Sequence, residues 1–262
     1  MNILQKIIEH KKIEVAEAKK TVSVAELEKR PFFGREVLSL QASLLDTSKT
    51  GIIAEFKRKS PSKGVINDKA SVVEVTKGYT DAGAACLSVL TDRDFFGGTP
   101  ADLEAARVNA VPILRKDFIV DEYQILEARA MGADVILLIA ACLKPKEVKH
   151  LAQFAAGLGL EVLLEIHGDD ELDHICGDTP IVGVNNRDLK TFTVDIERSI
   201  RLSQQLPVGK LLIAESGINR VETIRHMRDS GFHGFLVGEH FMKDQNPAIA
   251  FASFVQQLKS RR

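Results

Sequence analysis

The chain has few of the features that mark secreted, metal-binding or nucleic-acid-binding proteins. It has only three cysteines, Cys86, Cys142 and Cys176, and they are not clustered. Neither a disulfide framework nor a metal site is therefore expected, and we interpret all three as buried or incidental thiols. The formal net charge is −1. That balance gives no bulk attraction to nucleic acid or to an anionic membrane, so any anion site must be local.

Long hydrophobic runs are absent as well. No apolar stretch approaches the length of a membrane span, and the opening MNILQKIIEHKK does not resemble a secretory signal. We therefore expect a cytoplasmic protein without a membrane or nucleic-acid partner. The seven histidines show no metal-ligand spacing, and no GxGxxG fingerprint lies between a strand and a helix. Neither a metal ion nor an organic cofactor is expected.

Short apolar segments separated by stretches of helical periodicity are what the chain does have. Eight alternating strand and helix units predict an α/β fold, a closed (β/α)8 barrel with its helices outside. The length of 262 residues suits one such domain, 1–262, in which residues 1–50 form an N-terminal helical extension. The predicted strands are Ile52–Ala54, Cys86–Leu90, Val111–Leu114, Val135–Ala140, Val162–Leu164, Ile181–Val184, Leu211–Ala214 and Phe235–Val237.

The extension has its own helical signals. Ile3, Leu4, Ile7 and Ile8 form an apolar stripe at helical spacing. Ser23 and Glu26 match a capping box that begins a second short helix. Such an extension could close the bottom of the barrel or cover part of its mouth, and the sequence leaves both placements open.

Polar residues follow the apolar segments closely, and the carboxyl ends of barrel strands are where such enzymes place their chemistry. In IAEFKRKSPSKG (53–64), Glu55 and Lys57 lie two residues apart on one strand and so point to the same face. An inward Glu–Lys pair is costly unless it is paired or used. The segment Ser60–Gly64 suits a flexible, cationic loop over an anionic substrate. The alternative is a structural ion pair beside a solvated loop.

Two further strand ends carry candidate acid–base groups. Lys116 ends the third strand and could serve as a general acid or form a Schiff base, with Phe118 beside it to pack an aromatic substrate. Glu165 closes an apolar strand, where burial would raise its pKa and nearby lysines would lower it. We interpret His167, two residues later, as a loop residue because no partner pattern accompanies it.

The last strand ends offer groups that bind anions. Asn185 and Arg187 supply amide and guanidinium donors, and arginine suits a planar carboxylate. Gly217 in AESGI and Gly238 in FLVGEHFM follow the seventh and eighth strands. Backbone N–H groups there can approach a phosphate, and a short helix after the last strand would add its positive end. The alternative is that both glycines serve tight turns only.

Taken together, these segments and LTDRDFFGG (90–98) resemble the indole-3-glycerol phosphate synthase family of tryptophan biosynthesis, from about Ile3 to the C-terminus. The resemblance implies a (β/α)8 barrel with a helical extension. It also implies a carboxy-lyase without a cofactor. The expected substrate is a small phosphorylated molecule, 1-(2-carboxyphenylamino)-1-deoxyribulose 5-phosphate, which is decarboxylated and dehydrated as its ring closes.

The resemblance also assigns roles to residues. Lys116 would be the principal general acid and Glu165 its acid–base partner. Phe96 and Phe118 would hold the anthranilate ring, and Glu239 stands where some family members have a small hydroxyl residue, so only the backbone at Gly238 is carried over. The catalytic set is Lys116, Glu165, Lys57, Glu55, Asn185 and Glu215; the substrate-binding set is Ser60, Phe96, Phe118, Arg187, Ser216, Gly217 and Gly238.

Two rival functions remain open at this point. One is an aldolase-like enzyme that uses Lys116 as a Schiff base. The other is a non-catalytic phosphate-binding barrel, or a barrel that depends on a partner subunit as a synthase α-subunit does. The sequence also leaves open whether the protein is a monomer and whether it associates with other enzymes of tryptophan synthesis.

Overall fold

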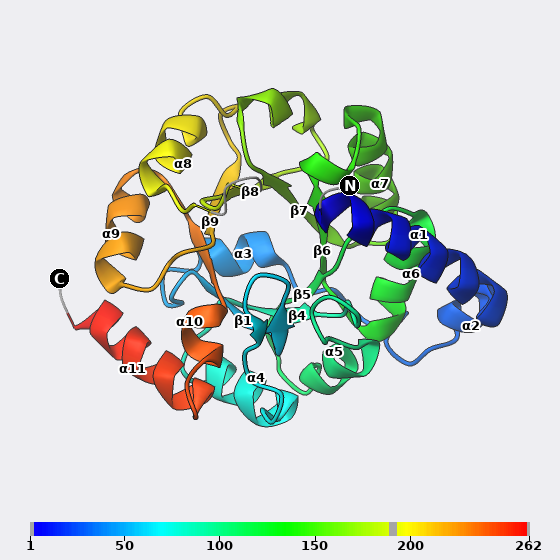
Figure 1. Cartoon of the computed structure of the whole chain (residues 1–262), viewed down its shortest axis with the longest axis horizontal. Coiled ribbons are helices and arrows are strands. Elements are labelled where there is room, and N and C mark those ends of the chain that lie inside the picture. The colour runs from blue at the N-terminus through cyan, green and yellow to red at the C-terminus, as the bar shows by residue number, and fades with distance from the viewer. Residues whose placement is uncertain (1–2, 189–192, 261–262) are drawn as a thin grey trace.

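The computed structural model describes residues 3–188 and 193–260, and a closed barrel of eight parallel strands forms its centre (Figure 1). The barrel closes because β1 pairs with β4 on one side and with β10 on the other. The predicted (β/α)8 fold is therefore confirmed. The barrel strands are β1 Ile52–Phe56, β4 Cys86–Leu90, β5 Ile113–Lys116, β6 Val135–Ile139, β7 Glu161–Ile166, β8 Ile181–Asn185, β9 Leu211–Glu215 and β10 Gly234–Val237.

An outer ring of helices covers the barrel (Figure 1). Between β7 and β8 the ring has only the 3₁₀ helix η2, and a second one, η1, follows β6. A small hairpin of β2 and β3 lies in the loop after β1. The other elements are β2 Lys59–Ser60, β3 Gly64–Val65, α4 Val72–Asp81, α5 Pro100–Ala106, α6 Glu122–Met131, η1 Ala140–Cys142, α7 Pro145–Gly157, η2 Asp169–His174, α8 Ile196–Ser203, α9 Val221–Asp229, α10 Glu239–Met242 and α11 Pro247–Lys259.

The inside of the barrel has an apolar layer below and a polar layer above. Side chains two residues apart on a strand point to the same face. Two residues after each interior apolar residue, the chain therefore places another side chain inside the barrel, one level nearer the carboxyl ends. The interior residues Ile53, Cys86, Leu114, Leu163, Ile181, Ile213 and Leu236 are followed in this way by Glu55, Ser88, Lys116, Glu165, Gly183, Glu215 and Gly238.

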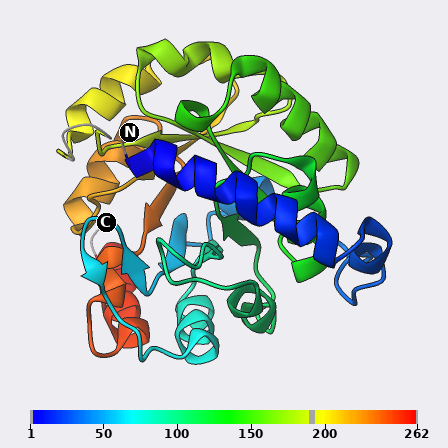
Figure 2. The same ribbon diagram turned by 45° about the vertical axis from the view of Figure 1, so that its right-hand side comes forward.

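The N-terminal extension occupies both of the positions that the sequence left open. It consists of α1 Ile3–Thr21, α2 Val24–Glu28 and α3 Leu40–Leu45. Helix α3 closes the bottom, where Leu40 and Leu44 join the interior apolar cluster. Helix α1 lies at the opposite end, across the mouth (Figure 2).

The predicted capping box of α2 is present. The Glu26 carboxylate accepts the backbone N–H of Ser23 at 2.7 Å. Within the described ranges, no helix combines the length and the apolar character that crossing a membrane requires.

Candidate active site

The ammonium of Lys116 lies among three glutamates at the carboxyl ends of the strands. Its Nζ is 3.2 Å from Glu215 Oε2, 3.7 Å from Glu55 Oε2 and 3.8 Å from Glu165 Oε2. Strand β9, which carries Glu215, stands across the barrel from β5, which carries Lys116. Lys116 therefore reaches the centre of the mouth, where one cation serves three carboxylates.

Two other predicted residues complete this cluster. Lys57 Nζ lies 2.7 Å from Glu55 Oε1, so the inward Glu–Lys pair expected from their spacing is present. Asn185 donates from Nδ2 to Glu165 Oε1 at 3.0 Å. The six residues predicted as catalytic are thus joined by direct contacts, although they come from five strands and the loop after β1.

Glycine makes room for two of the glutamates. A Cβ at Gly183 would lie 2.1 Å from Glu215 Oε1, and a Cβ at Gly238 would lie 2.5 Å from Glu55 Oε1. Neither separation is possible for real atoms, so any larger residue would displace a carboxylate. The sequence analysis missed Gly183, although a glycine in the middle of an apolar strand often marks a close approach.

The charges in this cluster set its protonation states. Burial by itself would lower the pKa of Lys116, but the charges of Glu215, Glu55 and Glu165 outweigh it and raise that pKa above its usual value. Burial would raise the pKa of Glu55, yet Lys57 and Lys116 hold it below its ordinary value. At neutral pH Lys116 is therefore protonated and Glu55 is ionised.

Glu165 and Glu215 differ in the direction of their pKa shifts. Burial favours the neutral form of both. For Glu165 the contacts with His167, Lys116 and Asn185 prevail, and its pKa is lowered. For Glu215 burial prevails over the attraction of Lys116, and repulsion by Glu165 adds to it, so its pKa is raised to about 7. Pairs of carboxyl groups with separated pKa values are typical of acid–base sites.

His167 lies in a loop, as predicted, and it has two carboxylate neighbours for which the sequence showed no pattern. Its Nε2 is 3.1 Å from Glu165 Oε1, and its Nδ1 is 3.5 Å from Glu171 Oε2. Burial would lower the pKa of His167, but the two glutamates raise it to about 10. The sequence hid this contact because Glu171 lies in η2, whose packing brings its carboxylate to the His167 backbone N–H, at 2.6 Å, and close to Nδ1.

The two residues predicted to contact the aromatic ring of the substrate, Phe96 and Phe118, lie side by side. The rings of Phe96 and Phe118 have centroids 5.9 Å apart and are inclined by 40°. Both side chains are partly exposed, and Phe118 follows Lys116 by two residues. An aromatic surface thus lies next to the charged cluster.

The loop after β9 has an unusual backbone. Ser216 and Gly217 both have positive φ, 68° and 71°, and among the described non-glycine residues only Ser216 does so. Such a conformation costs roughly 1–3 kcal/mol for a non-glycine residue and concentrates at ligand-binding sites. Gly238 is the N-cap of the short helix α10, and the carboxylate of Glu239 lies 3.8 Å from the Lys63 ammonium, which offsets its charge.

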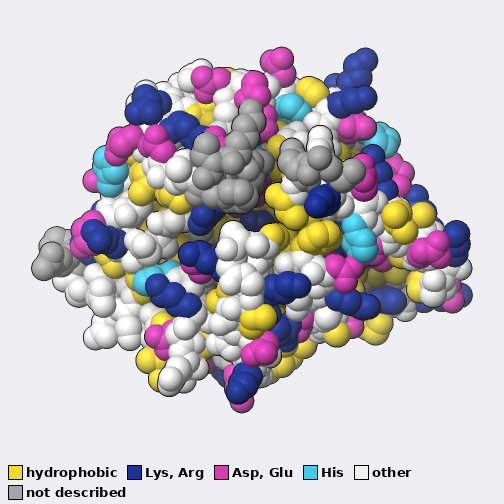
Figure 3. All heavy atoms as spheres, in the orientation of Figure 1, with side chains coloured by type: hydrophobic (Ala, Val, Ile, Leu, Met, Phe, Trp, Pro, Cys, Tyr) yellow, Lys and Arg dark blue, Asp and Glu magenta, His cyan; other side chains and the backbone are white. Residues whose placement is uncertain are grey.

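The remaining predicted residues lie around this cluster. The backbone N–H of Arg187 donates to Asn185 Oδ1 at 3.0 Å. Ser60 is buried in the hairpin after β1. The segment GVNNRDL (183–189) ends at Leu189, which lies outside the described residues. In Figure 3 this face is hollowed near its centre, with dark-blue lysine and arginine side chains around the hollow.

The barrel and this cluster define the class of the protein, a (β/α)8 barrel whose mouth holds a lysine among glutamates, side chains of the kind that acid–base chemistry uses. In residues 3–188 and 193–260 no three His, Cys, Asp or Glu side chains are grouped so that they could hold a metal ion.

Comparison with known proteins gives the family. A family model for indole-3-glycerol phosphate synthase matches residues 4–254. The synthase of Bacteroides thetaiotaomicron is 45% identical over 262 residues, which cover 98% of this chain and 99% of that protein. The synthase of Bordetella pertussis is 43% identical over 259 residues, 97% of this chain and 99% of that protein. The chain belongs to the indole-3-glycerol phosphate synthase family.

Solved structures with a similar fold are more distant in sequence. A mutant tryptophan synthase α-subunit from Pyrococcus furiosus superposes with a TM-score of 0.60 at 15% identity, over 80% of this chain and 98% of that one. The α-subunit from Legionella pneumophila gives 0.60 at 14% identity, over 84% and 96%. At these identities the likeness concerns the barrel fold alone.

Proposed function

We propose that this enzyme closes the indole ring of 1-(2-carboxyphenylamino)-1-deoxyribulose 5-phosphate, releasing carbon dioxide and water and forming indole-3-glycerol phosphate. Membership of the family supports this reaction. The observation that carries the assignment of residues is the Lys116 ammonium held among three carboxylates, beside an aromatic pair. Such a cluster offers both a protonated donor and proton acceptors within one site.

The first step needs an acid. As the ring carbon attacks the ketone of the substrate, negative charge develops on the carbonyl oxygen. Lys116, whose pKa is raised by its three glutamates, is protonated and can donate to that oxygen. Glu55 keeps both Lys116 and Lys57 charged through contacts at 3.7 and 2.7 Å. Loss of carbon dioxide then restores the aromatic ring.

The second step needs a base and an acid. Dehydration removes a proton from the new five-membered ring, and hydroxide leaves with a proton from an acid. We assign the base to Glu165, because its lowered pKa makes it a carboxylate at neutral pH. Lys57 or Lys116 would protonate the leaving hydroxide. The other lysine would balance the negative charge that remains in the site.

Binding orients the flexible substrate so that its ends can react. Phe96 and Phe118 would hold the carboxyphenyl ring. The backbone at Gly217 and Gly238, with Lys57, would hold the phosphate. Groups at the ends of β8 and β9 would contact the carboxylate, the amine and the hydroxyls; these are Asn185, Arg187, Glu215 and Ser216, and Ser60 would contact the substrate from the hairpin after β1.

The electrostatics disfavour the aldolase-like rival. A Schiff base requires an unprotonated amine, whereas three carboxylates hold Lys116 in its ammonium form. Borohydride trapping with a carbonyl substrate tests this directly. The proposal expects no adduct at Lys116, and a stable adduct there would favour the rival.

One assay tests the proposed function. The purified chain is incubated with the carboxyphenylamino substrate in excess chelator, and indole fluorescence is followed. The chain has no tryptophan, so the product signal has little protein background. Turnover by the protein alone supports the proposal and also contradicts the rival that needs a partner subunit. No turnover with or without added divalent ions would refute it.

A further inference from the structure

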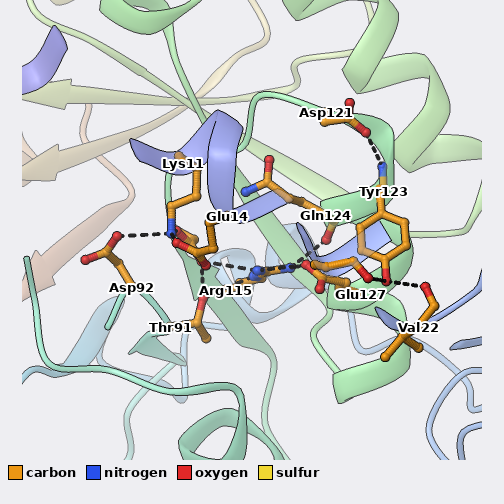
Figure 4. A network of polar contacts seen from close by, with 12 residues as sticks. Lys11, Glu14, Val22, Thr91, Asp92, Arg115, Asp121, Tyr123, Gln124 and Glu127 are labelled. Carbon is orange, nitrogen blue, oxygen red and sulfur yellow. Dashed lines mark hydrogen bonds and ion pairs between the residues drawn. The ribbon is translucent and has the colours of Figure 1, made fainter. Parts of the chain in front are cut away.

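A lysine of the N-terminal helix is buried beneath the mouth of the barrel. Lys11, on α1, has a side chain only 1% exposed, and its Nζ lies 3.0 Å from Asp92 Oδ2 and 3.0 Å from Asp117 Oδ1 (Figure 4). Asp92 follows β4 and Asp117 follows β5, so one ammonium bridges the carboxyl ends of two neighbouring strands. The neighbouring Lys12 is exposed.

Each of these aspartates also holds the backbone of a loop that carries an aromatic residue. Asp92 Oδ1 accepts the N–H groups of Phe95 and Phe96 at 2.9 and 3.1 Å. Asp117 Oδ1 accepts the N–H of Phe118 at 2.8 Å. A short path of ionic contacts and hydrogen bonds therefore runs from Lys11 to the backbone of both rings that form the aromatic surface.

The rest of the network shows which cations could replace Lys11. Arg115 Nη2 lies 3.1 Å from Asp117 Oδ2, and the Thr91 hydroxyl donates to the same oxygen at 2.5 Å. Among the ion pairs of the described residues, Asp92 has Lys11 as its cation, whereas Asp117 has both Lys11 and Arg115. Removing the ammonium would leave the buried Asp92 carboxylate unpaired beside a second one, which is strongly unfavourable.

Helix α1 is fixed to the same loop and to α6 by separate contacts. His10 forms an ion pair with Asp94, and its ring meets that of Phe95 edge-on at 5.6 Å. The Tyr123 hydroxyl, on α6, donates to the carbonyl of Val22 at 2.7 Å, just beyond the end of α1 (Figure 4). The helix therefore has anchors that do not depend on Lys11.

We propose that Lys11 is a positioning residue for the ring-binding side of the active site. Through Asp92 and Asp117 it sets the relative position of Phe96 and Phe118, which hold the carboxyphenyl ring. It does not contact the predicted phosphate site at Gly217 and Gly238. The inference rests on the proposed function, because that function gives the aromatic pair its ligand.

The test compares two fragments of the substrate on the same variant. Anthranilate probes the ring side and inorganic phosphate probes the other, each as a competitive inhibitor of the wild type, of Lys11→Met and of the matched control Lys12→Met. We expect Lys11→Met to weaken anthranilate inhibition and to lower kcat/KM by about tenfold or more, a scale typical of small misplacements. Phosphate inhibition should stay within about twofold of wild type, and Lys12→Met should match wild type throughout.

Removing the charge of Asp92 gives a second test of the proposal. Asp92→Asn keeps an oxygen that can accept the Phe96 N–H but removes the unpaired charge, so adding it to Lys11→Met should recover part of the lost ring affinity. If Lys11→Met does not fold, Lys11→Arg carries the test, since it retains the charge but its larger planar head would shift the two loops. Lys11→Arg should weaken inhibition by anthranilate and leave inhibition by phosphate unchanged.

Equal weakening of both inhibitors would overturn the inference, as would a lower melting temperature with unchanged kinetics, because either is what a purely structural lysine would give. If the wild type does not turn over the substrate, the proposed function fails separately. Anthranilate binding is then measured by its own fluorescence. Equal affinity in the wild type and Lys11→Met, or no binding to the wild type, overturns the inference.

Discussion

Lys116 donates a hydrogen bond to Glu215 across the barrel, 3.2 Å from Nζ to Oε2. Glu215 is also the carboxyl group whose pKa burial raises to about 7. The strongest partner of the proposed acid therefore changes charge within the physiological pH range. As a carboxylate it stabilises the ammonium, and as a neutral acid it leaves that task to Glu55 and Glu165.

The kinetics should report this titration. We expect kcat of the wild type to rise with an inflection near pH 7, as Glu215 ionises and orders Lys116 and the substrate hydroxyls. Glu215→Gln should remove that inflection and lower kcat at pH 8. The measurement is a pH profile of kcat from pH 5.5 to 9. An inflection that persists unchanged in Glu215→Gln would exclude Glu215 as its source.

The same shift predicts how stability changes with pH. The pKa of Glu215 is raised from 4.5 to about 7, so its contribution is fully present below pH 4.5 and is lost as the pH rises through 7. The free energy of unfolding of the wild type should therefore fall relative to that of Glu215→Gln over this window. Urea unfolding at pH 4.5, 6 and 7.5 measures it. A constant difference would contradict the shift.

Lys116→Ala should lower kcat by at least about a thousandfold, the combined scale of losing a general acid and a stabilising charge. Substrate affinity should change less, since the ring and phosphate contacts remain. Steady-state kinetics with the exposed-site control Lys149→Ala measures both. A mutant within a few-fold of wild type would remove Lys116 from the mechanism.

His167→Gln tests whether His167 holds Glu165 ionised. Without the nearby cation the pKa of Glu165 should rise, so the acidic limb of the kcat/KM profile should move to higher pH. The loss of activity should therefore grow as the pH falls, since each unit by which the pKa rises changes the ionisation ratio tenfold. The matched control is His150→Gln, since the surface residue His150 is also paired with a glutamate, Glu122. Parallel profiles for His167→Gln and wild type would refute this role.

The His167 shift also has a stability signature. Its pKa is raised from 6.5 to about 10, so its contribution is complete below pH 6.5 and is lost as the pH rises through 10. The wild type should lose unfolding free energy relative to His167→Gln between those values. Denaturation at pH 6.5 and 9.5 gives the comparison, and no relative loss would contradict it.

Gly238→Ala should lower kcat as well as raise KM. If Gly238 only made room for the phosphate, its substitution would change substrate affinity alone. The new Cβ would also collide with Glu55, which contacts Lys57 and Lys116. We expect kcat to fall by about tenfold or more. Gly157→Ala, on α7 where a Cβ would meet nothing within 4 Å, is the control. A change in KM with kcat intact would assign Gly238 to phosphate only.

Much of the site could be predicted because it depends on local periodicity. A strand alternates its faces, so the apolar Ile53 and the acidic Glu55 must share the inside of the barrel, as must Leu163 and Glu165. Eight such strands separated by helical stretches close into one barrel, which brings their carboxyl ends together. The chain order of the polar residues was therefore enough to predict that they gather at one end of the barrel.

The tertiary structure alone decided how these residues interact. Glu165 and Glu215 both end apolar strands and look alike in sequence, yet their pKa values shift in opposite directions, because the shift depends on charges brought from other strands and loops. The contact of His167 with Glu171 and the burial of Lys11 under the mouth depend in the same way on where η2 and α1 pack. Periodicity determines which face a side chain occupies, whereas its partners across the barrel are set only when the chain closes.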